Sequence, residues 1–178
     1  MNLLIVESPA KAKTINKYLG DQFEVIATVG HFRDLAKKNG VVISEDQKDV
    51  ILNWETTSAG EKLLDNIRKK AINYETIYLA TDPDREGEAI TWHLVNSLEK
   101  DVDSKKFKRI TFNEITKKAV LLSFEKARSV DQDLVSAYMA RRSLDYLAGY
   151  NLSPVLWRKM PGSRSCLLYT SPSPRDSD

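Results

Sequence analysis

The stretch that decides the fold is residues 77–90, which read IYLATDPDREGEAI. A short apolar run rich in strand formers, 77–80, leads into three alternate acids, Asp82, Asp84 and Glu86, and a helical pattern follows at once. A strand that ends in this way gathers carboxylate oxygens at the carboxyl edge of a sheet, where ligands of α/β proteins collect. Such oxygens suit Mg²⁺, which binds few carboxylates, several waters and a phosphate. The stretch therefore predicts a metal site at a sheet edge.

The start of the chain repeats this arrangement. The strand expected over 2–6 is apolar from Leu3 to Val6, which is typical of a strand buried on both faces, and Glu7 follows directly. Ser8 is a good N-cap and Pro9 suits the first helical position, so a helix is expected over 9–19. Lys11 would lie in its first turn, where N–H groups and an ammonium can seat a phosphate. The alternative for this lysine is a solvated surface position.

Composition and charge narrow the class of protein. The 178 residues allow one or two domains, and 42% hydrophobic with 29% charged residues exclude a disordered or membrane protein. The single cysteine, Cys166, excludes an internal disulfide and favours a reducing cytoplasm. Residues 1–100 carry 13 Lys/Arg and 16 Asp/Glu, whereas residues 101–178 carry 14 and 9. The basic surplus of the second part hints at a polyanionic partner.

Alternating elements predict an α/β fold with a mostly parallel, Rossmann-like sheet and flanking helices. Strands are expected over 2–6, 23–29, 76–80 and 108–112, and helices over 9–19, 59–71, 86–99, 115–127 and 131–149. The polar segment 36–58 is interpreted as an excursion or a small strand pair. From residue 116 the strand signals stop, which indicates a second, helical region.

Six blocks, in order, resemble the bacterial type IA DNA topoisomerase I family. They are VESPAKAKTI at 6–15, GH at 30–31, DPDREGE at 82–88, FNEIT at 112–116, ARR at 140–142 with Asp145 and GY at 149–150, and SPVLW at 153–157. The resemblance runs from about residue 3 to residue 165 and implies a TOPRIM metal-binding domain over 1–115. It further implies the start of a helical DNA-binding domain over 116–165.

The resemblance also implies roles for particular residues. Glu7 and Lys11 would be catalytic, with Lys11 steadying the scissile phosphate, and Mg²⁺ would be held by Glu7, Asp82, Asp84 and Glu86. The implied DNA contacts are His31, Arg141, Arg142, Asp145, Tyr150 and Trp157. The family breaks and rejoins one DNA strand through a 5′-phosphotyrosine without ATP, and so relaxes negatively supercoiled DNA. A monomer in the cytoplasm, associated with the nucleoid, is implied.

The end of the chain departs from this pattern. Residues 166–178 do not continue the family sequence, and their Ser/Pro alternation cannot form a core, so we expect a disordered or artefactual tail. The family's nucleophilic tyrosine lies farther along, and no tyrosine of this chain is assigned that role. We therefore expect the chain to be inactive alone.

Other interpretations of the same residues stay open. Arg141 and Asp145, four positions apart, can form a surface ion pair instead of contacting DNA. Glu88 is expected to serve only as a favourable first-turn acid, and the basic run 105–109 to be a solvated face. The acids can also belong to another TOPRIM enzyme, such as a nuclease or primase, or to a non-catalytic nucleic-acid-binding module.

Overall fold

The computed structural model describes residues 1–28, 30–46, 48–71 and 73–159. They form two compact units. The first consists of Met1–Asp34 and Glu55–Tyr138, and the second of Leu35–Trp54 and the described residues from Met139 onward. These units follow packing, and the domain boundary predicted at residue 115 stays a prediction.

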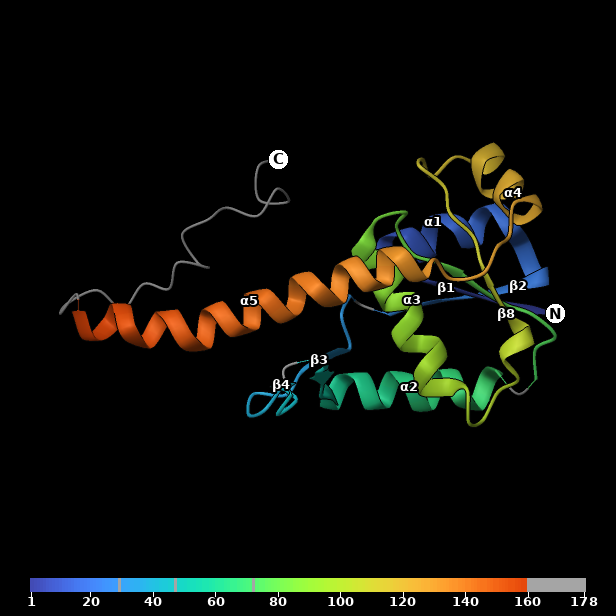
Figure 1. Cartoon of the computed structure of the whole chain (residues 1–178). Coiled ribbons are helices and arrows are strands. Elements are labelled where there is room, and N and C mark those ends of the chain that lie inside the picture. Colours follow the sequence, from blue (N-terminus) through green and yellow to red (C-terminus); the bar gives the residue numbers. More distant parts are fainter. Residues whose placement is uncertain (29, 47, 72, 160–178) are drawn as a thin grey trace. The chain divides into compact units, whose positions relative to one another are not determined.

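A four-stranded sheet forms the centre of the first unit (Figure 1). Its strands are β1 (Asn2–Val6), β2 (Phe23–Ala27), β7 (Ile77–Ala80) and β8 (Phe107–Arg109), in the order β2-β1-β7-β8. All three neighbouring pairs are parallel, which confirms the predicted parallel α/β architecture. Because the central strands β1 and β7 are neighbours, segments more than 70 residues apart in sequence end side by side.

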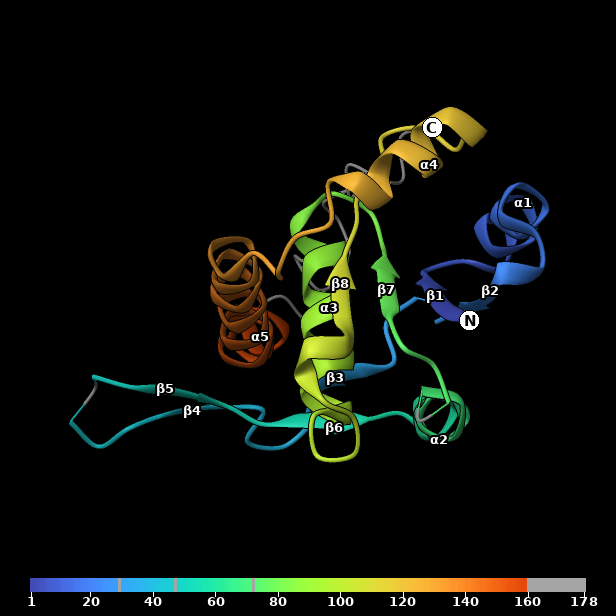
Figure 2. The same ribbon diagram turned by 90° about the vertical axis from the view of Figure 1, so that its right-hand side faces the viewer.

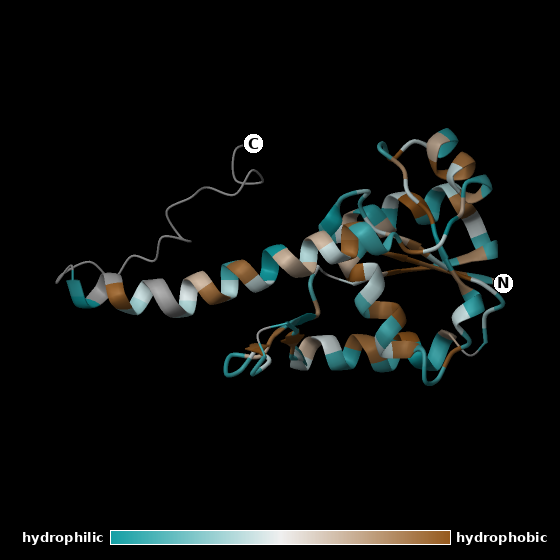
Figure 3. Ribbon diagram, in the orientation of Figure 1, coloured by the Kyte–Doolittle hydropathy of each residue, from teal (hydrophilic) through white to brown (hydrophobic). Residues whose placement is uncertain are grey.

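Helices cover both faces of this sheet (Figure 2). On β1, Leu3 and Ile5 pack against α2 (Ser58–Ala71) and α3 (Arg85–Leu98), whereas Leu4 and Val6 pack against α1 (Pro9–Leu19) and α4 (Lys117–Glu125). This alternation follows from the two-residue period of a strand. All four side chains are buried, and full burial stabilises each by about 1.5–3 kcal/mol. The apolar strands between more polar helix surfaces are visible in Figure 3.

Local signals set the ends of α1 as predicted. The Ser8 side chain accepts a hydrogen bond from the Lys11 backbone N–H, and Pro9 occupies the first helical position. At the other end Gly20 has φ of +63°, a left-handed conformation that favours glycine, and the short 3-10 helix Gly20–Gln22 follows. A second 3-10 turn, Ser104–Lys106, precedes β8.

Four elements differ in length from the prediction by two residues or more. The helix expected over 115–127 covers only Lys117–Glu125 (α4), because Thr116 caps its start. β2 ends at Ala27, because Gly30 turns the chain with φ of +80°. β8 covers only three residues, and Arg109 forms an isolated antiparallel bridge with Arg128. The last helix, α5 (Gln132–Lys159), runs ten residues past its predicted end through Gly149 and Pro154. A proline removes one backbone donor, but it does not end this helix.

The second unit contains the small strand pair expected in 36–58. Strands β4 (Val41–Ile43) and β5 (Val50–Leu52) pair antiparallel, and β3 (Arg33–Leu35) and β6 (Trp54–Thr56) form another two-stranded sheet. On α5, the Tyr146 hydroxyl accepts from the Gly40 backbone N–H at 3.0 Å. A Cβ on Gly40 would lie 2.7 Å from the Tyr146 ring, so this close approach requires glycine. Among the described residues, no helix combines the length and apolar character needed to span a membrane.

Candidate functional site

The register of the sheet brings two predicted acids together. Val6 of β1 lies opposite Ala80 of β7 in a parallel pair, so Glu7 and Asp82 follow neighbouring strand ends. The chain after β2 joins the same edge, because the Gly30 backbone N–H donates to the Glu7 carbonyl at 3.0 Å. The sheet thus collects at one edge the segments that carry the predicted site.

Lys11 joins the two acids. Its Nζ lies 2.8 Å from a carboxylate oxygen of Glu7 and 2.5 Å from one of Asp82, and about a fifth of its side chain is exposed. Burial disfavours the charged lysine, but the hydrogen bonds and charges of Asp82 and Glu7 outweigh it and raise the pKa of Lys11. Lys11 is therefore part of a charged cluster, and the solvated alternative is wrong. We call Glu7, Lys11 and Asp82 the acid–lysine cluster.

The other two predicted metal ligands have different surroundings. Asp84 caps α3, since its carboxylate accepts the Gly87 backbone N–H at 2.7 Å. Glu86, in the first turn of that helix, lies 3.7 Å from the imidazole Nε2 of His31. The structure thus places Asp84 and Glu86 on the same turn as Asp82, where Asp84 caps α3 and Glu86 lies near His31.

Gly87 fixes the shape of this acidic turn. A Cβ at this position would lie 2.1 Å from the Asp82 carbonyl oxygen, a distance that no real side chain could occupy. The Thr81 hydroxyl donates to the Gly87 carbonyl at 2.6 Å and also lies 2.9 Å from the Thr91 hydroxyl. The DREGE sequence therefore needs its glycine for close contact between the turn and the helix.

His31 lies at the rim of this edge. It stacks on Tyr138 of α5, with ring centroids 6.1 Å apart and an interplanar angle of 15°. Together with the contact to Glu86, this links the loop after β2 to α3 and to the beginning of α5. His31 thus lies beside Glu86, one of the predicted acids, and its role in binding DNA stays a prediction.

Two charged residues of the first unit are buried. Glu88 lies in the first turn of α3, as expected, but it is completely buried. Arg109 is only 1% exposed, so the expectation of a solvated basic face is wrong for this residue. Arg109 Nε donates to Glu88 at 2.9 Å, which lets both charges enter the interior as a pair. Strand alternation carried a signal for this position, because Arg109 follows the inward-packed Phe107 by two residues.

The chemistry of the acid–lysine cluster fits a divalent cation only in part. Glu7 and Asp82 converge on one point, now taken by the Lys11 ammonium, and one or two carboxylates with waters suffice for Mg²⁺. Among the residues that the structure describes, no group of three or more His, Cys, Asp or Glu side chains could hold a metal ion. Any ion here would thus need water or phosphate ligands as well.

The second unit holds most of the predicted DNA contacts. Arg141 Nε lies 3.4 Å from Asp145, so the alternative of an exposed ion pair is realised. Tyr150 is about half exposed and stacks on Tyr146 with centroids 4.4 Å apart. Arg142 lies on the same helix. Trp157 belongs to α5 by its backbone, but its side chain and the tail 166–178 lie outside the described residues.

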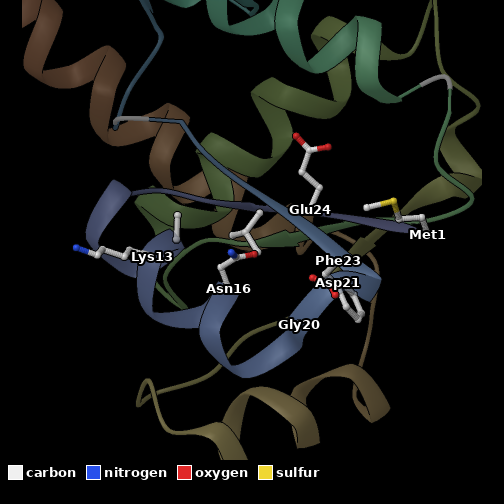
Figure 4. A pocket seen from close by; sticks show the side chains of 9 residues that line it. Met1, Lys13, Asn16, Gly20, Asp21, Phe23 and Glu24 are labelled. Atoms are coloured by element: carbon white, nitrogen blue, oxygen red, sulfur yellow. The ribbon is translucent and has the colours of Figure 1, made fainter.

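A depression in the surface of the first unit lies away from the acid–lysine cluster. Its volume is about 530 Å³, and α1 and β2 line it, with Lys13 and Asn16 on one side and Phe23 and Glu24 on the other (Figure 4). Phe23 is opposite Asn2, at the amino ends of the parallel strands. The depression therefore does not contain the acid–lysine cluster.

Comparisons with known proteins find curated relatives that match almost the whole chain. DNA topoisomerase 1 of Rickettsia typhi is 53% identical over 168 residues, which cover 93% of this chain and 21% of that protein. DNA topoisomerase 1 of Xylella fastidiosa is 49% identical over 176 residues, which cover 98% of this chain and 21% of that protein. The chain thus spans about a fifth of the length of the curated relatives it matches.

A solved structure and a family model complete the comparison. The structure of full-length topoisomerase I from Thermotoga maritima matches with a TM-score of 0.79 at 40% identity, over 93% of this chain and 27% of that chain. Residues 2–115, more than half of the sequence, match the model of the Toprim domain. Since this match covers β1 through β8 and the whole acid–lysine cluster, the chain belongs to the Toprim domain family.

Proposed function

We propose that this chain is part of a type IA DNA topoisomerase, in which the acid–lysine cluster handles the scissile phosphate. The parent protein would break and rejoin one DNA strand through a 5′-phosphotyrosine, with Mg²⁺ and without ATP, and would relax negatively supercoiled DNA. The observation that carries the proposal is Lys11, whose ammonium is held between Glu7 and Asp82 at the carboxyl edge of the sheet. Similarity to proteins named DNA topoisomerase 1 supports the choice among Toprim enzymes.

The charge of the cluster explains why a cation belongs to this function. Two carboxylates and one ammonium leave a net charge of −1, which repels a phosphodiester. A divalent cation would reverse that sign and, when bound, would stabilise negative charge on the phosphate oxygens. Glu7 and Asp82 would hold it, with Asp84 and Glu86 adding negative potential from the same turn. Lys11, once released from one carboxylate, can donate to a phosphate oxygen.

The second unit would contact the DNA strand. Arg141 and Arg142 can neutralise phosphates, and the half-exposed ring of Tyr150 offers a stacking surface worth roughly 1–3 kcal/mol per base. His31, Asp145 and Trp157 complete the proposed contacts. We further propose that the parent protein acts as a monomer on single-stranded segments, in the cytoplasm at the nucleoid.

Cation binding is tested first on the chain itself. Mn²⁺, a paramagnetic substitute for Mg²⁺, is titrated while the EPR signal of the free ion is followed. Asp82→Asn should weaken binding at least tenfold. The matched control Asp65→Asn removes an exposed acid of α2 and should change the affinity less than twofold. Equal affinities in both variants would favour the non-catalytic nucleic-acid-binding module.

The variant Lys11→Met should change Mn²⁺ affinity in the opposite direction to Asp82→Asn. If a cation competes with the Lys11 ammonium for Glu7 and Asp82, removing that ammonium should strengthen Mn²⁺ binding several-fold, because a positive charge at about 4 Å opposes a cation even in a polar site. Weaker binding in this variant would refute the competition.

Activity needs the rest of a topoisomerase, so the chain alone should not relax DNA. A chimera places this chain in the matched 168-residue segment of the Rickettsia typhi relative. It should relax a negatively supercoiled plasmid with Mg²⁺ and without ATP, and Lys11→Ala should abolish this activity. Lys13→Ala, on the same helix but exposed, is the control. Nucleotide release or primer synthesis in place of relaxation would instead favour a nuclease or a primase.

A further inference from the structure

We propose that Arg109 and Glu88 are positioning residues, which hold the Asp82 turn and the beginning of α5 in one fixed arrangement. Their role is distinct from that of the acid–lysine cluster, because neither side chain is exposed to a ligand. All the residues involved belong to the first compact unit.

The Arg109 guanidinium lies behind the acidic turn and bonds to its backbone. Nη2 donates to the Asp82 carbonyl at 2.7 Å, and Nη1 donates to the carbonyls of Thr81 at 2.8 Å and Leu79 at 3.0 Å. A single planar group thus fixes the path of the chain from the end of β7 to the acid. Lysine carries the same charge but could not reproduce this fork of donors.

Glu88 connects the same pair to a distant segment. Its carboxylate accepts from Arg109 Nε at 2.9 Å, from Arg128 Nη1 at 3.0 Å and from the Asp131 backbone N–H at 2.7 Å. Asp131 in turn accepts the Leu134 backbone N–H in the first turn of α5. The backbones of Arg109 and Arg128 also exchange two hydrogen bonds of 2.9 Å. Glu88 is therefore the shared acceptor for the acidic turn and the start of α5.

The arrangement has a functional consequence, which rests on the proposed cation site. The Asp82 carboxylate can converge with that of Glu7 on one point only if the Asp82 backbone stays at the end of β7. Arg109 holds that backbone from the buried side. Loosening the pair should therefore weaken cation binding without removing any ligand. It should also loosen the first turns of α5, which carries Arg141 farther along.

The test compares Arg109→Lys and Glu88→Gln with Leu98→Ala, a core variant at the far end of α3, all in the 178-residue chain. Amide hydrogen exchange of residues 81–87 and 135–138 is measured relative to β1. Arg109→Lys should speed exchange over 81–87 at least tenfold relative to β1, and Glu88→Gln should speed both segments. Leu98→Ala, if it destabilises the unit as a whole, should leave these ratios unchanged.

Mn²⁺ affinity, followed by EPR, is the second readout. The Mn²⁺ affinity should fall at least fivefold in Arg109→Lys and less than twofold in Leu98→Ala. Exchange ratios in Arg109→Lys and Glu88→Gln equal to those of Leu98→Ala would overturn the positioning role, whatever the metal result. If the unchanged chain binds no Mn²⁺, the proposed function fails, and exchange alone decides the positioning role. Should Arg109→Lys not fold, Glu88→Gln decides it.

Discussion

The buried histidine of α3 should make the first unit sensitive to acid. His93 is 1% exposed and lies edge-on to the Phe32 ring, 6.4 Å away. Burial lowers the pKa of His93 to about 3, the positive charges of Arg33 and His31 act in the same direction, and Asp34 opposes them. We expect His93→Gln to remove most of the decrease in the free energy of unfolding that His93 causes as the pH falls.

The magnitude follows from linkage. Above the unfolded-state pKa of about 6.5, His93 is neutral in both states and has no effect on pH dependence. Below it the unfolded chain binds a proton that the folded chain does not, so stability falls as pH decreases, by about 1.4 kcal/mol per pH unit. The loss reaches about 2 kcal/mol at pH 5 and roughly 5 kcal/mol near pH 3, where the folded chain begins to bind the proton.

Urea unfolding at pH 7.5 and pH 5.0 measures this difference directly. The unchanged chain should lose about 2 kcal/mol more than His93→Gln between the two pH values, even if the variant is less stable at both. His31 is the only other histidine of the sequence, so His31→Gln serves as the matched control and should keep the loss. The same pH dependence in His93→Gln as in the unchanged chain would refute the reasoning.

Three further replacements test contacts described above. Gly87→Ala should destabilise the first unit by about 3 kcal/mol in urea unfolding, because its Cβ cannot fit against the Asp82 carbonyl; a change below about 0.5 kcal/mol would contradict this. Ser8→Ala should cost about 1 kcal/mol through the lost helix cap, with Ser8→Gly costing only a few tenths, and equal losses in thermal unfolding would argue against capping. Tyr146→Phe should expose the Gly40 backbone amide to at least fivefold faster hydrogen exchange, and unchanged protection would show that the hydroxyl does not hold this loop.

Several features of the site could be read from local sequence. The acids after residues 2–6 and 77–80 were predicted because a buried strand followed at once by a carboxylate is a short-range pattern. The cap at Ser8 and the helix over 9–19 are equally local predictions, and the structure confirms both. Lys11 remained ambiguous at this level, since a first-turn lysine is usually solvated.

Other features depended on which segments become neighbours. Glu88 and Arg109 are 21 residues apart, and nothing in either neighbourhood indicates that each is the other's partner in the interior. The run 105–109 contains four basic residues, so composition favoured solvent for all of them, although strand alternation distinguishes Arg109, which the structure buries. The helix predicted over 131–149 ends at Gly149, whereas α5 continues past this residue to Lys159.

The sequence by itself determined the strand-and-acid pattern, the ends of α1 and the parallel α/β class, because periodicity and capping act over a few residues. Tertiary structure decided the pairing of charges. The order β2-β1-β7-β8 places Glu7 beside Asp82 with Lys11 between them, and the same order buries Arg109 behind the turn. Charge pairs depend on distances of a few ångströms between residues far apart in sequence, and only the packed sheet sets those distances.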